Sequence, residues 1–226
     1  MSYNEKASNY FGNIRIDLIN FLNTDQRGLK TLEVGAAYAE TLHYLKSNGI
    51  ASEAIGIDIF EDLANKQNYK PIDHYIFGNI EEMELPEYNN YFDLILLPDV
   101  LEHLIEPQKV LHKLSKYIKA EGTIVVSMPN IRHFSAFIKI FLKGNFKYEE
   151  SGLFDNTHLR FYCRKDIQDL LTSSGFEVVK QEGSIRNYKG MSITKIFNIL
   201  TFGLLEEFFS YQYFFKIKKA KSTKDE

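Results

Sequence analysis

Short apolar runs alternate along this chain with segments of helical periodicity, and this alternation constrains the fold more than any other feature. Five runs, at residues 32–34, 54–59, 74–77, 92–97 and 123–128, have the length and composition of β-strands. The run FDLILL at 92–97 is almost continuously apolar, which is typical of a strand covered on both faces. Because strands separated by helices form βαβ units, the pattern predicts a parallel sheet with right-handed crossovers.

Turn signals and helical spacing predict the other elements. Helices are expected over 38–47, over a short polar stretch from Glu61, and along a long segment through Val110 and Ile118. Beyond Asn130 the sequence predicts an aromatic helical stretch at 131–142, a charged loop at 143–156, a helix at 166–171, a strand at 176–179 and an antiparallel last strand at 211–217. The predicted fold class is therefore α/β, a Rossmann-like three-layer sandwich with a seven-stranded, mostly parallel sheet and an antiparallel last strand.

Composition excludes several classes of protein. The 226 residues fit one large α/β domain, and a formal net charge of -3 argues against nucleic-acid binding. The single cysteine, Cys163, rules out an intrachain disulfide and a cysteine-rich zinc cluster. Residues 1–17 lack the apolar core of a signal peptide, and the longest strongly apolar stretch, 196–205, is about half a membrane span. We therefore expect a cytoplasmic protein without a transmembrane segment.

Small residues follow the first predicted strand, where the chain turns into a helix. In LEVGAAYAE, the residues Gly35, Ala36, Ala37 and Ala39 let the backbone approach a ligand closely. Asp58 lies 23 residues beyond Gly35, at the end of the second strand. A carboxylate at that position can accept hydrogen bonds from both ribose hydroxyls of an adenosine cofactor.

Two cofactor classes use this layout, and the spacing of the small residues separates them. A nicotinamide cofactor needs Gly-x-Gly-x-x-Gly for its pyrophosphate, and that register places Glu40 at the third position. S-adenosylmethionine has no phosphate, and its site spaces small residues as Gly-x-Gly-x-Gly, which fits Gly35, Ala37 and Ala39. The sequence thus favours S-adenosylmethionine as the cofactor. A nicotinamide-dependent oxidoreductase is the least favoured function, behind the two functions that are described below.

The order and spacing of motifs over most of the chain resemble the small class I S-adenosylmethionine-dependent methyltransferases of bacterial type. The segments that carry this resemblance are LEVGAAYAE, GIDI, GNIEE, FDLILLPDVLEHL, EGTIVVSMPN, FDNTHLRFY and SYQYFF. Tyr10 and Phe11 with Arg15 resemble the N-terminal helix that caps the cofactor in this family. Together these segments imply a methyltransferase domain.

The resemblance implies a role for residues at the strand ends. Glu33 is expected to support the loop or to contact the methionine end of the cofactor, the alternative being a side chain that only satisfies backbone groups. Ile59 and Ile80 are expected to sandwich the adenine, with plain core packing as the alternative. Pro98 and Asp99 are expected to border the cofactor. The alternative for Asp99 is that it only N-caps a helix that begins at the next residue, although both roles can hold at once.

Three residues depart from the family pattern. Ala37 and Ala39 replace glycines, and Asn79 stands where an Asp usually accepts the adenine amino group. Alanine at a position with φ > 0 costs about 1 kcal/mol or more. The amide of Asn79 still accepts a hydrogen bond, but without charge assistance. We expect these departures to weaken cofactor binding without abolishing it.

The acceptor end is less well determined by the sequence. A hydroxyl acceptor needs a base, and His103 and His158 are the candidates, with Asp155 orienting His158; either histidine is alternatively structural. Arg160 binds an anionic acceptor or pairs with a carboxylate. Phe134 contacts the acceptor or packs on the core or on a second subunit. No His, Cys or Asp cluster has metal-ligand spacing, so no metal is expected.

The predicted organisation is a single domain. Its parts are an N-terminal capping helix in 1–29, a cofactor-binding core in 30–130, an acceptor-binding insertion or lid in 131–165, the rest of the core in 166–217 and a flexible tail in 218–226. Relatives with a segment like 157–162 act on sugars, which implies O-methylation of a sugar or glycan intermediate in polysaccharide biosynthesis. We expect a monomer or homodimer, with peripheral membrane contact through residues 191–209 as a further option. The runner-up function is a non-catalytic binding or scaffold protein with weakened cofactor affinity.

Overall fold

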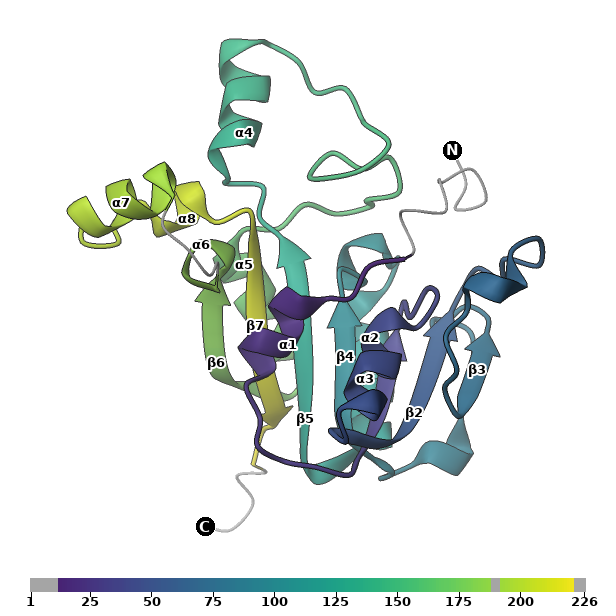
Figure 1. The fold of residues 1–226 in the computed structure, drawn as a ribbon. Coiled ribbons are helices and arrows are strands. Elements are labelled where there is room, and N and C mark those ends of the chain that lie inside the picture. The colour runs from purple at the N-terminus through teal and green to yellow at the C-terminus, as the bar shows by residue number, and fades with distance from the viewer. Residues whose placement is uncertain (1–11, 188–191, 222–226) are drawn as a thin grey trace.

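The computed structural model describes residues 12–187 and 192–221. Its centre is a seven-stranded sheet in the order β3-β2-β1-β4-β5-β7-β6, in which only β7 is antiparallel to its neighbours (Figure 1). The strands are β1 (Leu29–Val34), β2 (Ala51–Asp58), β3 (His74–Phe77), β4 (Phe92–Pro98), β5 (Ile118–Pro129), β6 (Phe176–Gly183) and β7 (Gln212–Lys219). The predicted fold class, including the antiparallel last strand, is confirmed.

Helices cover both faces of the sheet and give it three layers. On one face lie α1 (Ile16–Leu22) and α2 (Glu40–Ser47); on the other lie α3 (Pro107–Tyr117) and α5 (Arg164–Ser173). Strand β4 shows why both faces need cover. Its Leu94 packs with α1 and its Ile95 with α3, because successive side chains of a strand point to opposite faces.

One predicted helix is missing, and another begins later than expected. No helix begins at Glu61; the chain instead makes turns that lead into the single 3-10 turn η3 (Lys66–Asn68), and the Asp62 carboxylate accepts hydrogen bonds from the backbone and side chain of Asn65. Such local side-chain bonds compete with helix formation. Likewise only the 3-10 turn η5 (Leu101–His103) follows β4, and a true helix starts at Pro107, whose fixed φ suits the first helical turn.

The segment after β5 leaves the body of the molecule. The predicted helical stretch at 131–142 divides into α4 (Phe134–Phe137) and the π-helix η6 (Ile138–Leu142), and a long loop then returns to α5. Figure 1 shows α4 and this loop standing beyond the carboxyl ends of the central strands. The C-terminal boundary also moves, because β7 continues to Lys219 into the predicted tail.

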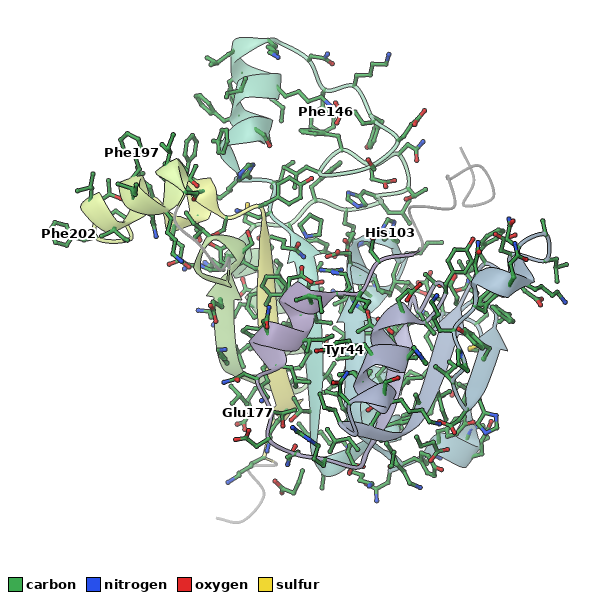
Figure 2. All side chains as sticks on the ribbon, viewed as in Figure 1. Tyr44, His103, Phe146, Glu177, Phe197 and Phe202 are labelled. Atoms are coloured by element: carbon green, nitrogen blue, oxygen red, sulfur yellow. The ribbon has the colours of Figure 1, made fainter. Side chains whose placement is uncertain are left out.

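The last helices expose apolar side chains. After the short α6 (Ser184–Asn187), α7 (Ile193–Leu200) and α8 (Glu206–Phe209) lie beside α4, to which they are joined by ring contacts of Phe208 with Phe134 and Phe137. Phe202 is 95% exposed and points away from the body (Figure 2). Over residues 12–187 and 192–221, no helix combines the length and the apolarity needed to cross a bilayer.

Candidate functional site

A cavity of about 690 Å³ lies at the carboxyl ends of β1, β2 and β4, the edge where parallel sheets bind ligands. Its volume is within the range of pockets that hold drug-sized molecules. The described residues around it include every predicted cofactor residue except Ala39, together with His103. Ala39 is fully buried beneath the turn, so it shapes the backbone and does not line the cavity.

The turn from β1 into α2 is held in a left-handed backbone conformation. Gly35 has φ 75°, Ala37 has φ 48° and Ala39 has φ 59°. A Cβ on Gly35 would lie 2.9 Å from Cγ2 of Val100, so glycine is required there by space as well as by φ. The two alanines stand where glycine is cheaper, which gives the expected strain a physical basis in the structure.

Asp58 ends β2 and binds the neighbouring turn through its carboxylate. Its Oδ2 accepts the backbone N–H of Ala37 at 2.7 Å, and its Oδ1 accepts the backbone N–H of Phe60 at 2.9 Å. Burial raises the pKa of Asp58, and these backbone hydrogen bonds partly offset that rise. Since each carboxylate oxygen has two acceptor positions, both oxygens can accept a further hydrogen bond.

Glu33 is a buried carboxylate on β1 at the wall of the cavity. Burial raises its pKa to about 8, and the positive charge of Arg15 opposes this rise. Among the described residues, its Oε2 finds no hydrogen-bond partner. An unsatisfied buried oxygen that borders a cavity suits a ligand carrying a cationic or hydrogen-bond-donating group.

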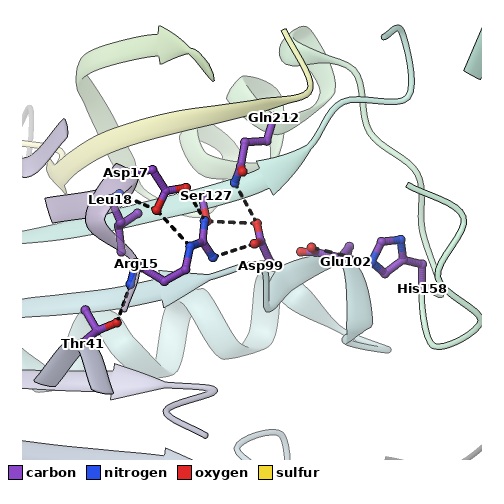
Figure 3. Close-up of polar contacts among 9 residues, drawn as sticks. All are labelled: Arg15, Asp17, Leu18, Thr41, Asp99, Glu102, Ser127, His158 and Gln212. Carbon is purple, nitrogen blue, oxygen red and sulfur yellow. Dashed lines mark hydrogen bonds and ion pairs between the residues drawn. The ribbon is translucent and has the colours of Figure 1, made fainter. Parts of the chain in front are cut away.

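Arg15 connects the first described segment to Asp99, directly after β4, and to Ser127, near the end of β5 (Figure 3). Its guanidinium donates to Asp99 at 2.6 Å, to Asp17 at 3.0 Å and to Ser127 at 3.2 Å. Burial alone would lower the pKa of Arg15, but the charges of Asp99 and Asp17 have the larger combined effect. The pKa therefore lies above its ordinary value, and the guanidinium stays protonated. Gln212 on β7 also donates to Asp99, at 3.2 Å.

The predicted N-cap role of Asp99 is wrong. No side-chain cap bond precedes η5, whose preceding residue is Val100, and the Asp99 carboxylate instead binds Arg15, Ser127 and Gln212. Asp99 also has φ 53°, an unfavourable value for a residue other than glycine. Strain of this kind persists only where the surroundings over-determine it, as this hydrogen-bond network does.

The two isoleucines predicted to sandwich an adenine differ in exposure. Ile59 is 56% exposed and Ile80 is 5% exposed, although both line the cavity. Asn79 is tied to its own loop, since its Oδ1 accepts the backbone N–H of Glu81 at 3.0 Å and its amide donates to Glu82 at 3.1 Å. The adenine contacts of these residues stay a prediction.

The two histidines predicted as candidate bases differ in their position relative to the cavity. His103 lines the cavity, whereas His158 is buried behind it, and their rings lie 4.7 Å apart between centroids. The Nδ1 of His158 bonds the carbonyl of Leu153 at 3.2 Å, while the Asp155 carboxylate accepts the N–H and the hydroxyl of Thr157. The Leu153 carbonyl therefore helps to orient His158, and the predicted orienting role of Asp155 stays a prediction.

Arg160 and Phe134 are not among the described residues that line the cavity. Arg160 donates to the backbone carbonyl of Ile105, which does line it, whereas Phe134 packs on Phe208 and Phe209. The predicted contacts of both side chains with an acceptor stay a prediction. The insertion reaches the cavity through Leu159, whose backbone N–H donates to the carbonyl of Glu102 at 2.9 Å.

Sequence reasoning missed three residues of the site. Ser127 and Gln212 bind Asp99, and Glu102 lies beside the two histidines. Ser127 interrupts an apolar run in the fifth strand, and Glu102 follows a leucine in a buried segment, so each carried a signal as a polar group among apolar neighbours. Gln212 carried none, because its position depends on how β7 pairs with β5.

Comparison with known proteins gives the chain a family. A family described as "Methyltransferase domain" matches residues 5–181. The chain is 30% identical to an uncharacterized protein of Methanocaldococcus jannaschii over 68% of its length, and 23% identical to a mitochondrial ubiquinone biosynthesis O-methyltransferase of Dictyostelium discoideum over 82%. These alignments span 63% and 58% of the two curated proteins, less than two thirds of each.

Solved structures share the fold. The chain superposes on a SAM-dependent methyltransferase of Archaeoglobus fulgidus with a TM-score of 0.63. The superposition covers 94% of this chain and 95% of the other, at 20% sequence identity. At that identity the likeness establishes the arrangement of strands and helices and nothing about the acceptor.

Proposed function

The chain belongs to the class I S-adenosylmethionine-dependent methyltransferase domains, and we propose that it transfers a methyl group from S-adenosylmethionine to a small acceptor. The observation that carries this proposal is the cavity at the strand ends, where Asp58 and Glu33 border a turn of small residues. When bound, the cofactor supplies an activated methyl group on a sulfonium. The protein then has to hold the acceptor atom in line with the methyl group and the sulfur of the cofactor, and to disfavour other orientations of the two molecules.

The residues present fit this cofactor in chemical type. Asp58 has acceptor capacity left for ribose hydroxyls after binding two backbone N–H groups. Glu33 offers the buried oxygen described above, which suits the ammonium group of the methionine part. The apolar side chains of Ile59 and Ile80 suit a flat base. These roles rest on the chemistry of the residues and on the family resemblance.

For the acceptor, we propose a hydroxyl compound, with a sugar or glycan intermediate as the first class to test. The support is the resemblance of residues 157–162 to a segment of sugar-modifying relatives, and the insertion that contains it reaches the cavity at Leu159. The Dictyostelium relative is named as an O-methyltransferase, which agrees with oxygen as the methylated atom. The first candidate base is His103, and the support for it is that its side chain borders the cavity.

The second candidate function is a non-catalytic binding or scaffold protein. The observation that favours it is the left-handed backbone at Ala37 and Ala39, which carries strain at the turn nearest the expected cofactor. In that case the fold is retained for a partner or a small ligand, and cofactor affinity is lost. Direct binding measurements separate the two functions.

Calorimetric titration of the full chain with S-adenosylmethionine and S-adenosylhomocysteine is the deciding experiment. We expect binding at micromolar concentration, weakened about 100-fold or more in Asp58→Ala, because charge-assisted hydrogen bonds are each worth about 1.5–3 kcal/mol. Asp93→Ala is the matched control, since Asp93 pairs with Lys119 at the opposite end of β4. No binding of either compound up to about millimolar concentration would place the scaffold function first.

A further inference from the structure

Glu102 is a fully buried carboxylate without a hydrogen-bond partner for its side chain. It lies in η5, has 0% exposure, and neither of its carboxylate oxygens makes a hydrogen bond among residues 12–187 and 192–221. A group in this position must either hold a proton or be paired with a positive charge.

Two imidazoles surround this carboxylate. The Nε2 of His158 lies 3.9 Å from Oε1 of Glu102, and His103 is the next residue along η5. Each of the three side chains offers one ligand atom, and these atoms all lie within 4.8 Å of one another. The expectation of no metal depended on sequence spacing, and the fold brings together segments that lie 54 positions apart.

Backbone carbonyls fix the tautomers of both histidines. The Nδ1 of His103 bonds the carbonyl of Thr157 at 3.1 Å, and the Nδ1 of His158 bonds the carbonyl of Leu153 at 3.2 Å. Because a carbonyl oxygen only accepts, each Nδ1 carries a hydrogen, and in the neutral ring the lone pair is then on Nε2. Metal-ligating histidines characteristically donate the other ring N–H to a carbonyl or carboxylate in this way.

We propose that Glu102, His103 and His158 form a binding site for a divalent transition-metal cation of the Zn²⁺ type. Two imidazoles and one carboxylate are the ligand set of several catalytic zinc sites, whereas Mg²⁺ and Ca²⁺ prefer oxygen ligands. Zinc bonds of about 2.1 Å separate tetrahedral ligand atoms by roughly 3.4 Å, so each side chain must move inward by less than about 1 Å. The cation also balances the buried charge of Glu102.

The position of the site suggests its use. His103 lines the cavity, so a cation on these three ligands adjoins the space where an acceptor would bind. A site with three protein ligands keeps a coordination position for water or substrate, and an acceptor oxygen is the natural occupant. This use rests on the proposed methyl transfer, and it replaces the role of His103 as a base, because an imidazole bound through Nε2 with a hydrogen on Nδ1 has no lone pair left. Binding of the cation by the protein does not rest on that function.

Spectroscopic titration with Co²⁺ tests the site on the full chain after treatment with a chelator. We expect one equivalent to bind at micromolar concentration or tighter with visible absorption bands, and Zn²⁺ to displace it. Glu102→Gln keeps the shape of the side chain and should weaken binding by about 100-fold or more, since even outer residues of metal sites are worth about 10–100-fold. His112→Gln is the matched control, because His112 is exposed on α3 and bonds the backbone of its own helix.

A second variant guards against loss of the fold. His103 is partly exposed, so His103→Gln should remain folded by circular dichroism and still lose Co²⁺ binding. The proposal is overturned if wild-type protein binds neither Co²⁺ nor Zn²⁺ up to about 100 µM, or if folded Glu102→Gln and His103→Gln bind Co²⁺ as tightly as wild type. Such outcomes would leave Glu102 as a protonated structural acid.

The titration is made without cofactor, which separates this proposal from the proposed function. Co²⁺ binding with no S-adenosylmethionine binding would support the metal site and contradict the methyltransferase activity. S-adenosylmethionine binding without Co²⁺ binding would do the reverse.

Discussion

Two regions of the molecule depart from the usual rule that apolar side chains are buried and charged ones exposed. They are the strand ends and the apolar lobe, which comprises α4, η6, α7 and α8 with the turns between α7 and α8. At the strand ends, carboxylates are buried: Glu33 is 3% exposed and Glu102 is 0% exposed. In the lobe, large apolar groups are exposed: Phe202 at 95%, Leu204 at 85% and Phe141 at 72%. Burial of a charge is costly, whereas exposure of an apolar side chain costs the folded state little.

This difference indicates which region of the molecule combines a functional role with an effect on the free energy of unfolding. The buried charges lie on β1 and next to β4, in the centre of the sheet, so a change in their ionisation acts on the whole fold. The lobe is held to the body at its base, where Glu207 of α8 pairs with Arg164 of α5, and Figure 1 shows α4 standing out from the sheet. We therefore expect substitutions at the strand ends to change the free energy of unfolding far more than substitutions in the lobe.

The largest expected effect is a pH-dependent stabilisation in Glu33→Gln. The pKa of Glu33 rises from an ordinary value of 4.5 to about 8 on folding, so the folded state binds more protons than the unfolded state between these values. Its contribution is fully present below pH 4.5 and is lost as the pH rises through 8. Relative to wild type, Glu33→Gln should gain about 4 kcal/mol between pH 4.5 and pH 9.

Urea denaturation at several pH values measures this gain. Glu61→Gln serves as the control, because Glu61 is exposed in a loop. A difference between Glu33→Gln and wild type that is the same at every pH would show that Glu33 is ionised in the folded protein, and the contrast between the two regions would lose its main support.

A smaller effect is expected when Arg15 is replaced by methionine. The substitution removes the partner of Asp99, whose side chain is 37% exposed and so partly solvated. Solvation limits the loss to about 1–2 kcal/mol of unfolding free energy. Arg27→Met is the matched control, since Arg27 bonds only nearby backbone carbonyls among the described residues. Equal unfolding free energies for the two variants would mean that the Arg15 network does not stabilise the strand ends.

Relief of strain should give a gain of about 1 kcal/mol in Ala37→Gly, because alanine at φ 48° is strained and glycine is not. Ala39→Gly is the informative comparison. Ala39 is also left-handed, but its methyl group is fully buried, so the lost burial of about 0.8 kcal/mol offsets most of the relief. Thermal unfolding of both variants checks the order; a greater gain in Ala39→Gly would contradict it.

The smallest effect belongs to the lobe. Phe202→Ser should change the unfolding free energy by less than about 0.5 kcal/mol, as is usual for exposed positions. Phe214→Ala is the contrast, because Phe214 is 1% exposed on β7 and its truncation should cost about 3–5 kcal/mol. A loss above about 1 kcal/mol in Phe202→Ser would show that the lobe is part of the stabilising core.

The fold could be predicted from sequence because its signals are local. The apolar run at 92–97 became β4 with one added residue, and the run at 74–77 became β3 unchanged. The turn of small residues and Asp58 were found for the same reason, since each follows directly from the end of a strand. The helix expected at Glu61 failed because the Asp62 side chain competes for the backbone, an effect that periodicity does not report.

The acceptor end could not be predicted to the same extent. Glu102 and His158 meet only because the insertion folds back and the N–H of Leu159 bonds the carbonyl of Glu102. That contact depends on the path of a long loop, and no periodicity in 143–156 encodes it. Arg160 was assigned to an acceptor from the chemistry of its guanidinium, and Phe134 from its place in the insertion. Arg160 bonds the carbonyl of Ile105 and Phe134 packs on Phe208, contacts that the sequence does not encode.

The close approach of Gly35 to Val100 brings together two turns that line the same cavity. A Cβ at Gly35 would lie 2.9 Å from Val100, so the turn after β1 rests directly against the turn that leads into η5. A ligand that orders one turn therefore restricts the other. By thermodynamic reciprocity, any gain in acceptor affinity produced by the cofactor equals the gain in cofactor affinity produced by the acceptor. We therefore expect the glycine at this position to transmit cooperativity between the two substrates.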